Sequence, residues 1–232
     1  MIDIAEVLRG CPLFAGFPQA AIAQAVPHAR VRSFRRNEAV YEKGEPQVWL
    51  CVIASGMVRI HSMNAEGREA LLIVLDQGAW VGDAVFAPGV DRVYGATAHT
   101  AAEIVELPGD FFRDLMARYP ECYPVILDCI SRRLWSAMTL IEEDALRGTL
   151  ARIGRRLLFL CDIQRGDKPR ADGPVTIALT REHIANMMGM TRQGVHKTLK
   201  QFEAEGLIEL GYRCITVPDE SALMNFLEHA QD

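Results

Sequence analysis

Residues 179–219 read LTREHIANMMGMTRQGVHKTLKQFEAEGLIELGYRCITVPD and form the most informative stretch of the chain. Thr180 and Thr191 each stand where the N-cap of a helix is expected, and apolar residues follow each of them at helical spacing. Gly189 separates the two segments and is expected to end the first helix. Two short helices joined by so short a turn are typical of a helix-turn-helix.

The second predicted helix has two chemically different faces. Val195, Leu199 and Phe202 share one face and are expected to be buried. The other face is polar and is expected to hold Arg192, Gln193, His196, Lys197 and Lys200. A helix about 10 Å wide fits the major groove of DNA, where arginine can bind guanine, glutamine can bind adenine and lysine can neutralise phosphate. We predict a DNA-binding site made of Thr180, Thr191, Arg192, Gln193, His196 and Lys197.

A β-hairpin is expected directly after the helix pair. Residues 207–210 and 214–217 alternate apolar and polar side chains around a turn at 211–213, which predicts a wing beside the helices. The whole chain is mildly acidic, with a formal net charge of -5. Residues 147–213 nevertheless hold 12 basic and 7 acidic side chains. Positive charge is therefore concentrated where DNA binding is predicted.

The amino-terminal half has a different pattern. Between residues 31 and 107, short β-branched runs are interrupted by glycine, which predicts a small antiparallel barrel or sandwich. Residues 64–67 are expected to form a hairpin tip, and Gly44, Gly56 and Gly78 stand between runs, where a positive φ is useful. The first 30 residues and residues 108–119 are expected to form helices that flank the strands.

A longer helix is predicted from about Pro124 to Asp144. Its apolar residues recur at steps of three and four, which is the pattern of a seam between two packed helices. The seam either packs on the protein's own barrel or pairs with a second copy of the chain, and its length favours the second copy. The predicted dimer interface is Leu127, Ile130, Leu134, Ala137 and Ile141.

Several features of the remaining sequence narrow the class of protein. Residues 149–161 predict a basic helix, in which Arg152, Arg155 and Arg156 either balance nearby acids or contact the DNA backbone. The polar segment 164–174 predicts a loop. The six cysteines lack the spacing of a zinc site, so we expect free thiols and no metal. Without a membrane-length apolar run or a signal peptide, a cytoplasmic protein with no membrane partner is expected.

These motifs together resemble the bacterial transcription regulators of the cyclic-AMP receptor protein / fumarate-nitrate regulator (CRP/FNR) family, nearly from end to end. The resemblance implies an α+β fold with a cyclic-nucleotide-binding-type β jelly-roll (1–120), a long dimerisation helix (121–146) and a winged helix-turn-helix (147–232). In the family, an Arg-Glu pair and a later Arg read bases. Here Arg192, Gln193 and Lys197 match them, and Gln in place of Glu implies a different half-site.

The resemblance also implies an effector pocket. The family's Gly-Glu and Arg-Ser pairs, which hold a cyclic nucleotide, correspond here to Gly82-Asp83 and Arg92-Val93. Ala137 and Met138 replace hydroxylated residues that contact adenine, and Val93 has no hydroxyl, so we expect an effector other than cyclic AMP. The pocket is expected to bind either an unidentified anion or no ligand, and Arg92 alternatively pairs with Asp83 or Asp91. The expected pocket is Gly82, Asp83, Arg92, Val93, Arg133 and Ala137.

Other cofactors of the family would leave marks in the sequence. An iron–sulfur cluster needs a group of cysteines near the amino terminus, where Cys11 stands alone, and haem needs an axial ligand, for which His61 and His99 are candidates. The sequence favours neither cofactor. We therefore predict a homodimeric, sensor-controlled DNA-binding regulator that recognises a palindromic operator and acts with RNA polymerase. The alternative is a cyclic-nucleotide-type module that acts on protein partners, and no catalytic constellation supports an enzyme.

Overall fold

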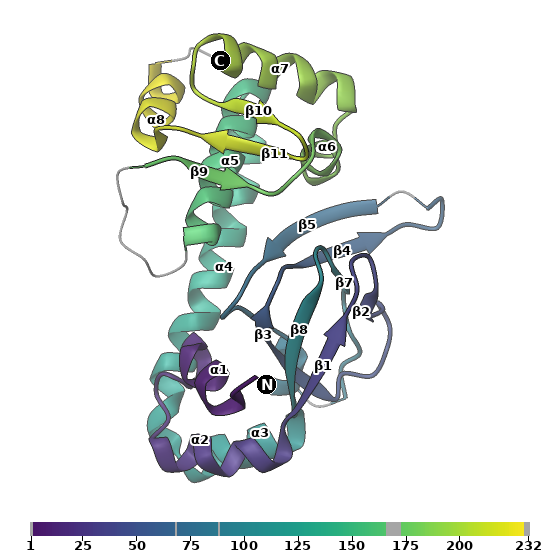
Figure 1. Cartoon of the computed structure of the whole chain (residues 1–232), viewed down its shortest axis with the longest axis vertical. Helices are drawn as coiled ribbons and strands as arrows, with labels where there is room; N and C mark the ends of the chain where they lie inside the picture. Colours follow the sequence, from purple (N-terminus) through teal and green to yellow (C-terminus); the bar gives the residue numbers. More distant parts are fainter. Residues whose placement is uncertain (1, 68, 88, 166–172, 230–232) are drawn as a thin grey trace. The chain divides into compact units, whose positions relative to one another are not determined.

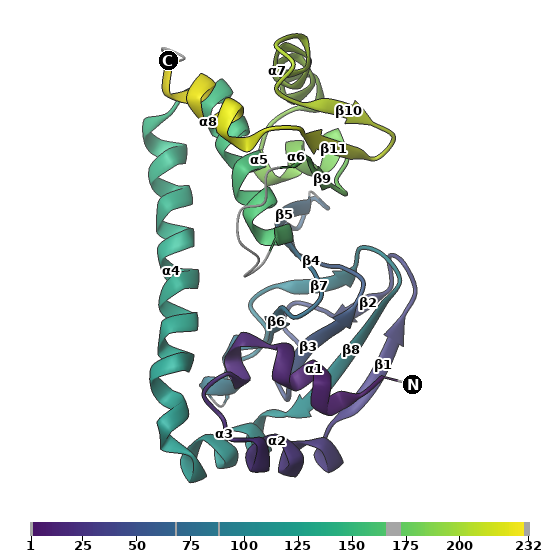
Figure 2. The same ribbon diagram turned by 60° about the vertical axis from the view of Figure 1, so that its left-hand side comes forward.

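The computed structural model describes residues 2–67, 69–87, 89–165 and 173–229 (Figure 1). The chain divides into two units, Met1–Ser136 and Ala137–Asp232. The division falls inside one continuous helix, α4 (Tyr123–Leu146), which Figure 2 shows without a break. None of the described helices combines the length and the apolar character that crossing a bilayer requires.

Two antiparallel four-stranded sheets form the first unit, with strand orders β1-β8-β3-β6 and β2-β7-β4-β5. Inward-facing side chains of both sheets bury one another, among them Phe34, Ile53, Val58 and Ile104. The predicted antiparallel sandwich is therefore confirmed. The strands are β1 (Arg30–Phe34), β2 (Ala39–Tyr41), β3 (Trp49–Ser55), β4 (Val58–Met63), β5 (Glu69–Leu75), β6 (Trp80–Val81), β7 (Gly95–Ala98) and β8 (Ala102–Pro108).

Glycines form the tight turns between these strands, as the sequence predicts. Gly44, Gly56 and Gly78 all have positive φ, at 88°, 77° and 87°. The Gly67 N–H donates to the Asn64 carbonyl at 3.0 Å and closes the hairpin tip between β4 and β5. A Cβ on Gly56 would stand 2.1 Å from the carbonyl oxygen of Ala101, so both φ and space require glycine there.

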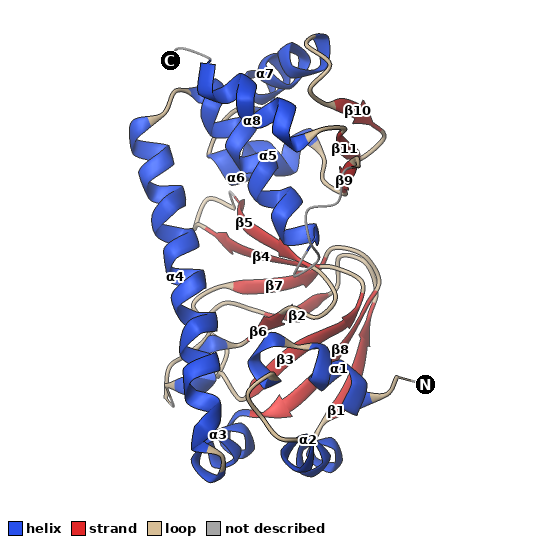
Figure 3. Ribbon diagram, turned by 90° about the vertical axis from the view of Figure 1, so that its left-hand side faces the viewer, coloured by secondary structure: helices blue, strands red, loops and turns tan. Residues whose placement is uncertain are grey.

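Short helices pack at one end of the sheets (Figure 3). Phe14, Phe17 and Phe112 form an aromatic cluster with ring centroids 5.5–5.9 Å apart, which joins the helices to the core under β3 and β8. The flanking helices are thus confirmed. They are α1 (Ile4–Gly10), α2 (Gln19–Ala25), α3 (Gly109–Arg118) and the 3-10 helices Pro12–Phe14 and Val26–His28. Two further 3-10 helices, Asp83–Phe86 and Pro120–Cys122, lie outside the predicted ranges.

Helix α4 buries one row of side chains and exposes another. Ile126 is buried in the core of the first unit, and Ile130 packs partly against the same core. Leu127, Leu134 and Ile141 are 60%, 59% and 62% exposed. Within the first unit, the barrel therefore leaves Leu127 and Leu134 uncovered, whereas Ile130 is half-buried against it. The predicted dimer interface stays a prediction.

The second unit is built from helices around a three-stranded sheet of order β10-β11-β9. Its core unites Ile153 and Leu157 with Ile184, Val195 and Phe202. The predicted helix pair and hairpin are confirmed. The elements are α5 (Thr149–Arg165), β9 (Val175–Ile177), α6 (Arg181–Met188), α7 (Arg192–Ala204), β10 (Glu209–Gly211), β11 (Cys214–Val217) and α8 (Glu220–His229).

Two elements of this unit are absent from the sequence-based expectations. Strand β9 has three residues, too few for a periodic pattern, and it becomes a strand by pairing Ile177 with Ile215. Helix α8 buries Leu223 and Leu227 one turn apart, and Leu227 fills the space beside Gly154 of α5. Most of the predicted loop at 164–174 lies outside the described residues.

Replacing Gly56 with alanine is expected to lower the free energy of unfolding by about 2–4 kcal/mol, because positive φ and the Ala101 carbonyl both oppose a Cβ. The control is Gly44→Ala, where φ is 88° but no atom lies within 4 Å of the new methyl group; its cost should be about 1 kcal/mol. Urea unfolding followed by tryptophan fluorescence measures both, since Trp49, Trp80 and Trp135 all lie in the first unit. Equal losses would contradict the close approach at Gly56.

Candidate nucleic-acid interface

The start of α6 is fixed by a reciprocal pair of hydrogen bonds. The His183 N–H donates to Thr180 Oγ1 at 3.2 Å, and the Thr180 N–H donates to His183 Nδ1 at 3.2 Å. Gly189 ends the helix in the left-handed conformation with φ 62°, as predicted. His183 therefore has a structural role at the helix start, and α6 is bounded by a capped start and a glycine stop.

Helix α7 is amphipathic in the predicted register. Thr191 Oγ1 accepts from the Gly194 N–H at 3.2 Å and caps the helix. Val195, Leu199 and Phe202 are fully buried. Because these residues hold one face against the core, the opposite face stays in solvent. Thr191, Arg192, Gln193 and Lys197 are exposed on it, and Thr180 is half-buried at the start of α6.

His196 departs from this pattern. Its side chain is half-buried, and within the described residues its buried Nδ1 has no hydrogen-bond partner. His196 therefore lies at the edge of the exposed face, and its role as a base-facing residue stays a prediction. Lys200, one turn farther along, is bonded to Glu203.

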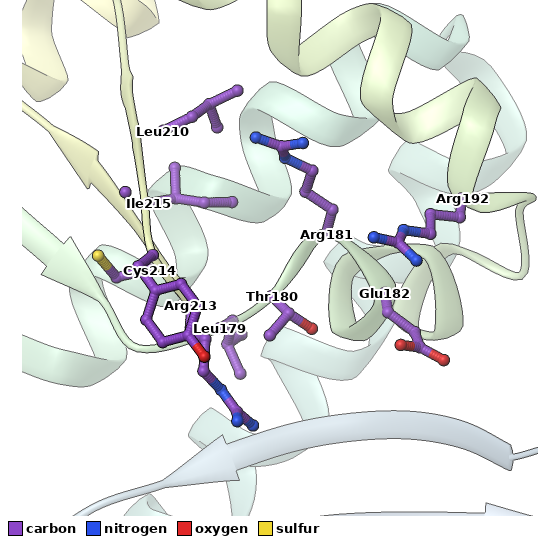
Figure 4. A pocket seen from close by; sticks show the side chains of 11 residues that line it. Leu179, Thr180, Arg181, Glu182, Arg192, Leu210, Arg213, Cys214 and Ile215 are labelled. Carbon is purple, nitrogen blue, oxygen red and sulfur yellow. The ribbon is translucent and has the colours of Figure 1, made fainter.

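A groove of about 460 Å³ runs between the wing and the starts of the two helices (Figure 4). Arg181 contributes from α6, Arg192 from α7 and Arg213 from the turn between β10 and β11. Glu182 is the one carboxylate among the lining residues. Three guanidinium groups from three elements suit a polyanion such as the DNA backbone.

Two of these arginines are missing from the residues predicted from sequence. Arg181 directly follows the N-cap Thr180, where backbone N–H groups already favour an anion, and that position was a usable signal. Arg213 is the second residue of the wing turn and lies 21 positions after Arg192 in the chain, so the two share a groove only because of the fold.

The basic helix α5 is neutralised within its own unit. Arg152 Nε lies 2.9 Å from Asp144 Oδ1, and Arg155 Nη1 lies 3.6 Å from Glu143 Oε1. Arg156 is only 6% exposed and lies 4.0 Å from Asp144. Burial lowers the pKa of Arg156, and the two acids oppose that shift. The expectation that these arginines balance nearby acids is confirmed.

In the first unit, Gly82, Asp83 and Arg133 lie together. Arg133 Nη1 lies 2.7 Å from Asp83 Oδ1, and its guanidinium covers the Trp80 ring at 3.4 Å from the centroid. Gly82 has φ 108°, and a Cβ there would stand 2.6 Å from the carbonyl oxygen of Trp49. Asp83 is thus already paired, and the backbone at Gly82 tolerates no side chain.

Arg92 is buried beside these residues but belongs to a separate contact. It is 5% exposed, and its guanidinium lies 3.5 Å from the centroid of the Tyr41 ring. Burial raises the pKa of Tyr41 and raises that of Cys51 to about 12, while Arg92 lowers both. In the described part of the chain, no ion pair joins Arg92 to Asp83 or Asp91, and its Nη1 has no hydrogen-bond partner. The interpretation that Arg92 pairs with an acid is therefore wrong.

The remaining residues of the predicted pocket are more open. Val93 is 54% exposed, and Ala137 and Met138 lie exposed on α4. His61, one candidate for a haem ligand, shares a hydrogen bond of 2.9 Å between its Nε2 and Thr97 Oγ1, and the other, His99, is buried. Among the described residues, no group of three or more His, Cys, Asp and Glu could hold a metal ion. All six cysteines are free.

Known proteins resemble both units. A model of the Crp-like helix-turn-helix domain matches residues 151–226, and a model of the cyclic nucleotide-binding domain matches residues 31–119. The chain is 30% identical to a CRP-like cAMP-activated global transcriptional regulator of Mycobacterium tuberculosis, over 94% of this chain and 97% of that protein.

Solved structures agree on the fold. FixK2 from Bradyrhizobium japonicum is similar with a TM-score of 0.72 at 19% identity, over 88% of this chain and 99% of that one. The c-di-GMP responsive global regulator CLP of Xanthomonas campestris is similar with a TM-score of 0.70 at 21% identity, over 87% and 100%. Because the mycobacterial relative is matched along nearly its whole length, both units share one assignment: the chain belongs to the CRP/FNR family of DNA-binding transcription regulators.

Proposed function

We propose that this regulator is a homodimer that reads a palindromic operator with α7 and is controlled by an anion bound in its first unit. The observation that carries the proposal is the division of α7 into two faces. Its apolar face is buried, so Arg192, Gln193 and Lys197 are presented to solvent together. A helix held in this way can enter a major groove without repacking its own domain.

Each exposed residue has a distinct task in this proposal. Arg192, in the first turn, donates two hydrogen bonds to guanine O6 and N7, and Gln193 donates to and accepts from adenine. Lys197 neutralises a phosphate or reaches a purine acceptor. Thr180 and Thr191 use an oxygen lone pair for their caps, which leaves each hydroxyl hydrogen free for a phosphate oxygen. Gly194 has no side chain and keeps this turn narrow.

Regulators of this family bind DNA and act as dimers. For this chain, the exposed row on α4 supports the same assembly: Leu127, Leu134, Trp135, Met138 and Ile141 are each at least 56% exposed. Water contact with so many large apolar side chains on one helix is unfavourable, and a second copy would cover them. Two-fold symmetry would then repeat the half-site about one DNA turn away, and the bound dimer would act on RNA polymerase.

The sensor ligand is proposed from the state of Arg92. A buried guanidinium with a free Nη1 is costly unless an acceptor arrives, so the pocket suits an anion. Asp83, which matches the acid of the family's Gly-Glu pair, is held by Arg133. Ala137 and Met138 offer no hydroxyl for adenine. Relatives are named as cAMP-activated and as c-di-GMP responsive, so one fold accepts different anions, and we propose one other than cyclic AMP here. Its binding would shift an equilibrium between dimer conformations.

Arg192→Ala should weaken binding to the preferred duplex by about 1–3 kcal/mol and relax the choice of base at one position. The preferred duplex is selected from random sequence by the wild-type protein, and affinities are measured by fluorescence anisotropy over a range of salt. Wild-type affinity should fall steeply with salt, because several phosphates are neutralised. Lys200→Ala is the matched control on the same helix, since Lys200 already pairs with Glu203. Unchanged base discrimination in Arg192→Ala would exclude the proposed role.

Leu134→Asp combined with Ile141→Asp should give monomers that no longer bind the operator tightly. Both side chains are exposed in the single chain, so their replacement leaves its core intact. Sedimentation velocity measures the mass, and Thr139→Asp is the control, because Thr139 is also exposed on α4 but lies outside the seam. A stable dimer of the double variant would show that another surface pairs the chains.

Arg92→Met should abolish stabilisation of the protein by its anion. Thermal unfolding of wild type is compared in cyclic AMP, cyclic di-GMP, cyclic GMP and inorganic phosphate, at matched ionic strength. At an anion concentration about 100 times its Kd, the wild type should gain about 2.7 kcal/mol, and the variant none. A gain with cyclic AMP that exceeds all the other anions would contradict the proposed ligand class.

A further inference from the structure

We propose that Arg213, at the tip of the wing, reads the minor groove next to the major groove that α7 occupies and selects A·T-rich sequence there. The inference rests on the proposed function of α7. In each half-site, α7 would read the bases of the major groove. The hairpin of β10 and β11 would read a second set of base pairs.

The wing has a two-residue turn, and its strands are held by pairing and by burial. Gly211 pairs with Cys214, so Tyr212 and Arg213 alone make the turn. Ile215 and Val217 of β11 are buried, and β11 also pairs with β9. A Cβ on Gly211 would stand 2.5 Å from Cys214 Sγ, so glycine leaves room for that side chain across the hairpin. The two tip residues therefore project from a rigid hairpin, which lowers the entropy lost when they bind.

The backbone of Arg213 is the unusual feature. Its φ is +60°, and in the described residues the other non-glycine residue with positive φ is Asn37. Asparagine adopts this conformation readily, whereas arginine does so at a cost in energy. Glycine or asparagine would make the same turn without that strain. An arginine kept in a strained conformation points to a use for its side chain.

The groove places this side chain on the DNA-facing surface. Arg213 and Arg192 line the same hollow of about 460 Å³, together with Thr180 at the start of α6. Figure 4 shows Arg213 on the wing side and Arg192 on the helix side. When α7 lies in a major groove, the wing faces the same duplex, and the neighbouring concave surface of B-DNA is a minor groove.

The chemistry at the tip fits a narrow minor groove. Arg213 is exposed, and Tyr212 beside it is 91% exposed. A·T-rich minor grooves are narrow and strongly negative, which attracts an arginine side chain, and they lack the guanine N2 amino group that would obstruct it. The Tyr212 ring can cover the sugar-phosphate edge while its hydroxyl donates to a phosphate. A phosphate contact by Arg213 would give affinity without sequence preference, and the experiment separates these two modes.

The test uses the duplex that wild-type protein selects from random sequence. Each base pair bordering the half-site is changed in turn to A·T, G·C or inosine·C, and dissociation constants are measured. Inosine·C has the major-groove acceptors of G·C but no minor-groove amino group, so it isolates minor-groove reading. Wild type should bind A·T and inosine·C about tenfold more tightly than G·C at one bordering position. Arg213→Asn keeps a residue suited to positive φ and should lose this preference while retaining selectivity at the positions read by α7.

Two controls make each outcome decisive. Arg181→Gln removes a neighbouring cation of the groove and should weaken all bordering sequences equally. Circular dichroism of the variants verifies that they are folded. The inference is overturned if inosine·C behaves like G·C, or if Arg213→Asn keeps the preference of wild type. Failure of the wild-type protein to select any duplex would instead overturn the proposed function, so the two failures are distinguishable.

Discussion

The buried side of α7 is the constraint on which the DNA-binding unit depends. Val195, Leu199 and Phe202 have no exposed surface, so the helix cannot rotate without losing apolar burial worth about 1.5–3 kcal/mol for each of these side chains. That fixed rotation puts Arg192, Gln193 and Lys197 in solvent, and the Thr180 and Thr191 caps set where the two helices begin. Specific side-chain chemistry at the surface follows from apolar packing beneath it.

Much of this arrangement can be predicted from the sequence, because it is encoded locally. N-caps, a glycine stop and a 3.6-residue period lie within one 41-residue stretch and predict both helices and the wing. Strands and their glycine turns in the first half are likewise local signals. What the sequence could not supply depends on distant contacts: β9 exists by pairing with β11, and Arg213 joins Arg192 only across the wing groove. The half-burial of His196 was likewise not predictable, because helical period alone does not tell how far a side chain at the edge of a face is covered.

In the first unit, prediction from sequence is limited even more strongly by contacts between distant residues. From the sequence, Asp83 and Arg92 are expected to bind the same ligand. In the structure they make separate contacts: Asp83 pairs with Arg133, which covers Trp80, whereas Arg92 stacks on Tyr41. A buried cation with an unused donor is a property of packing, and no spacing rule reveals it. In the proposed mechanism this donor links the ligand to the strands of the first unit, and α4, which begins in that unit and ends in the other, carries the change onward.

The central claim is that two copies of α7 lie in successive major grooves on one face of a duplex. Methylation protection of guanine N7 on the selected operator tests it most directly, because N7 is accessible only from the major groove. We predict two protected patches related by two-fold symmetry and separated by about one helical turn, ~34 Å, both lost in Arg192→Ala. A single patch, or a protein that binds tightly and leaves every guanine N7 reactive, would contradict it.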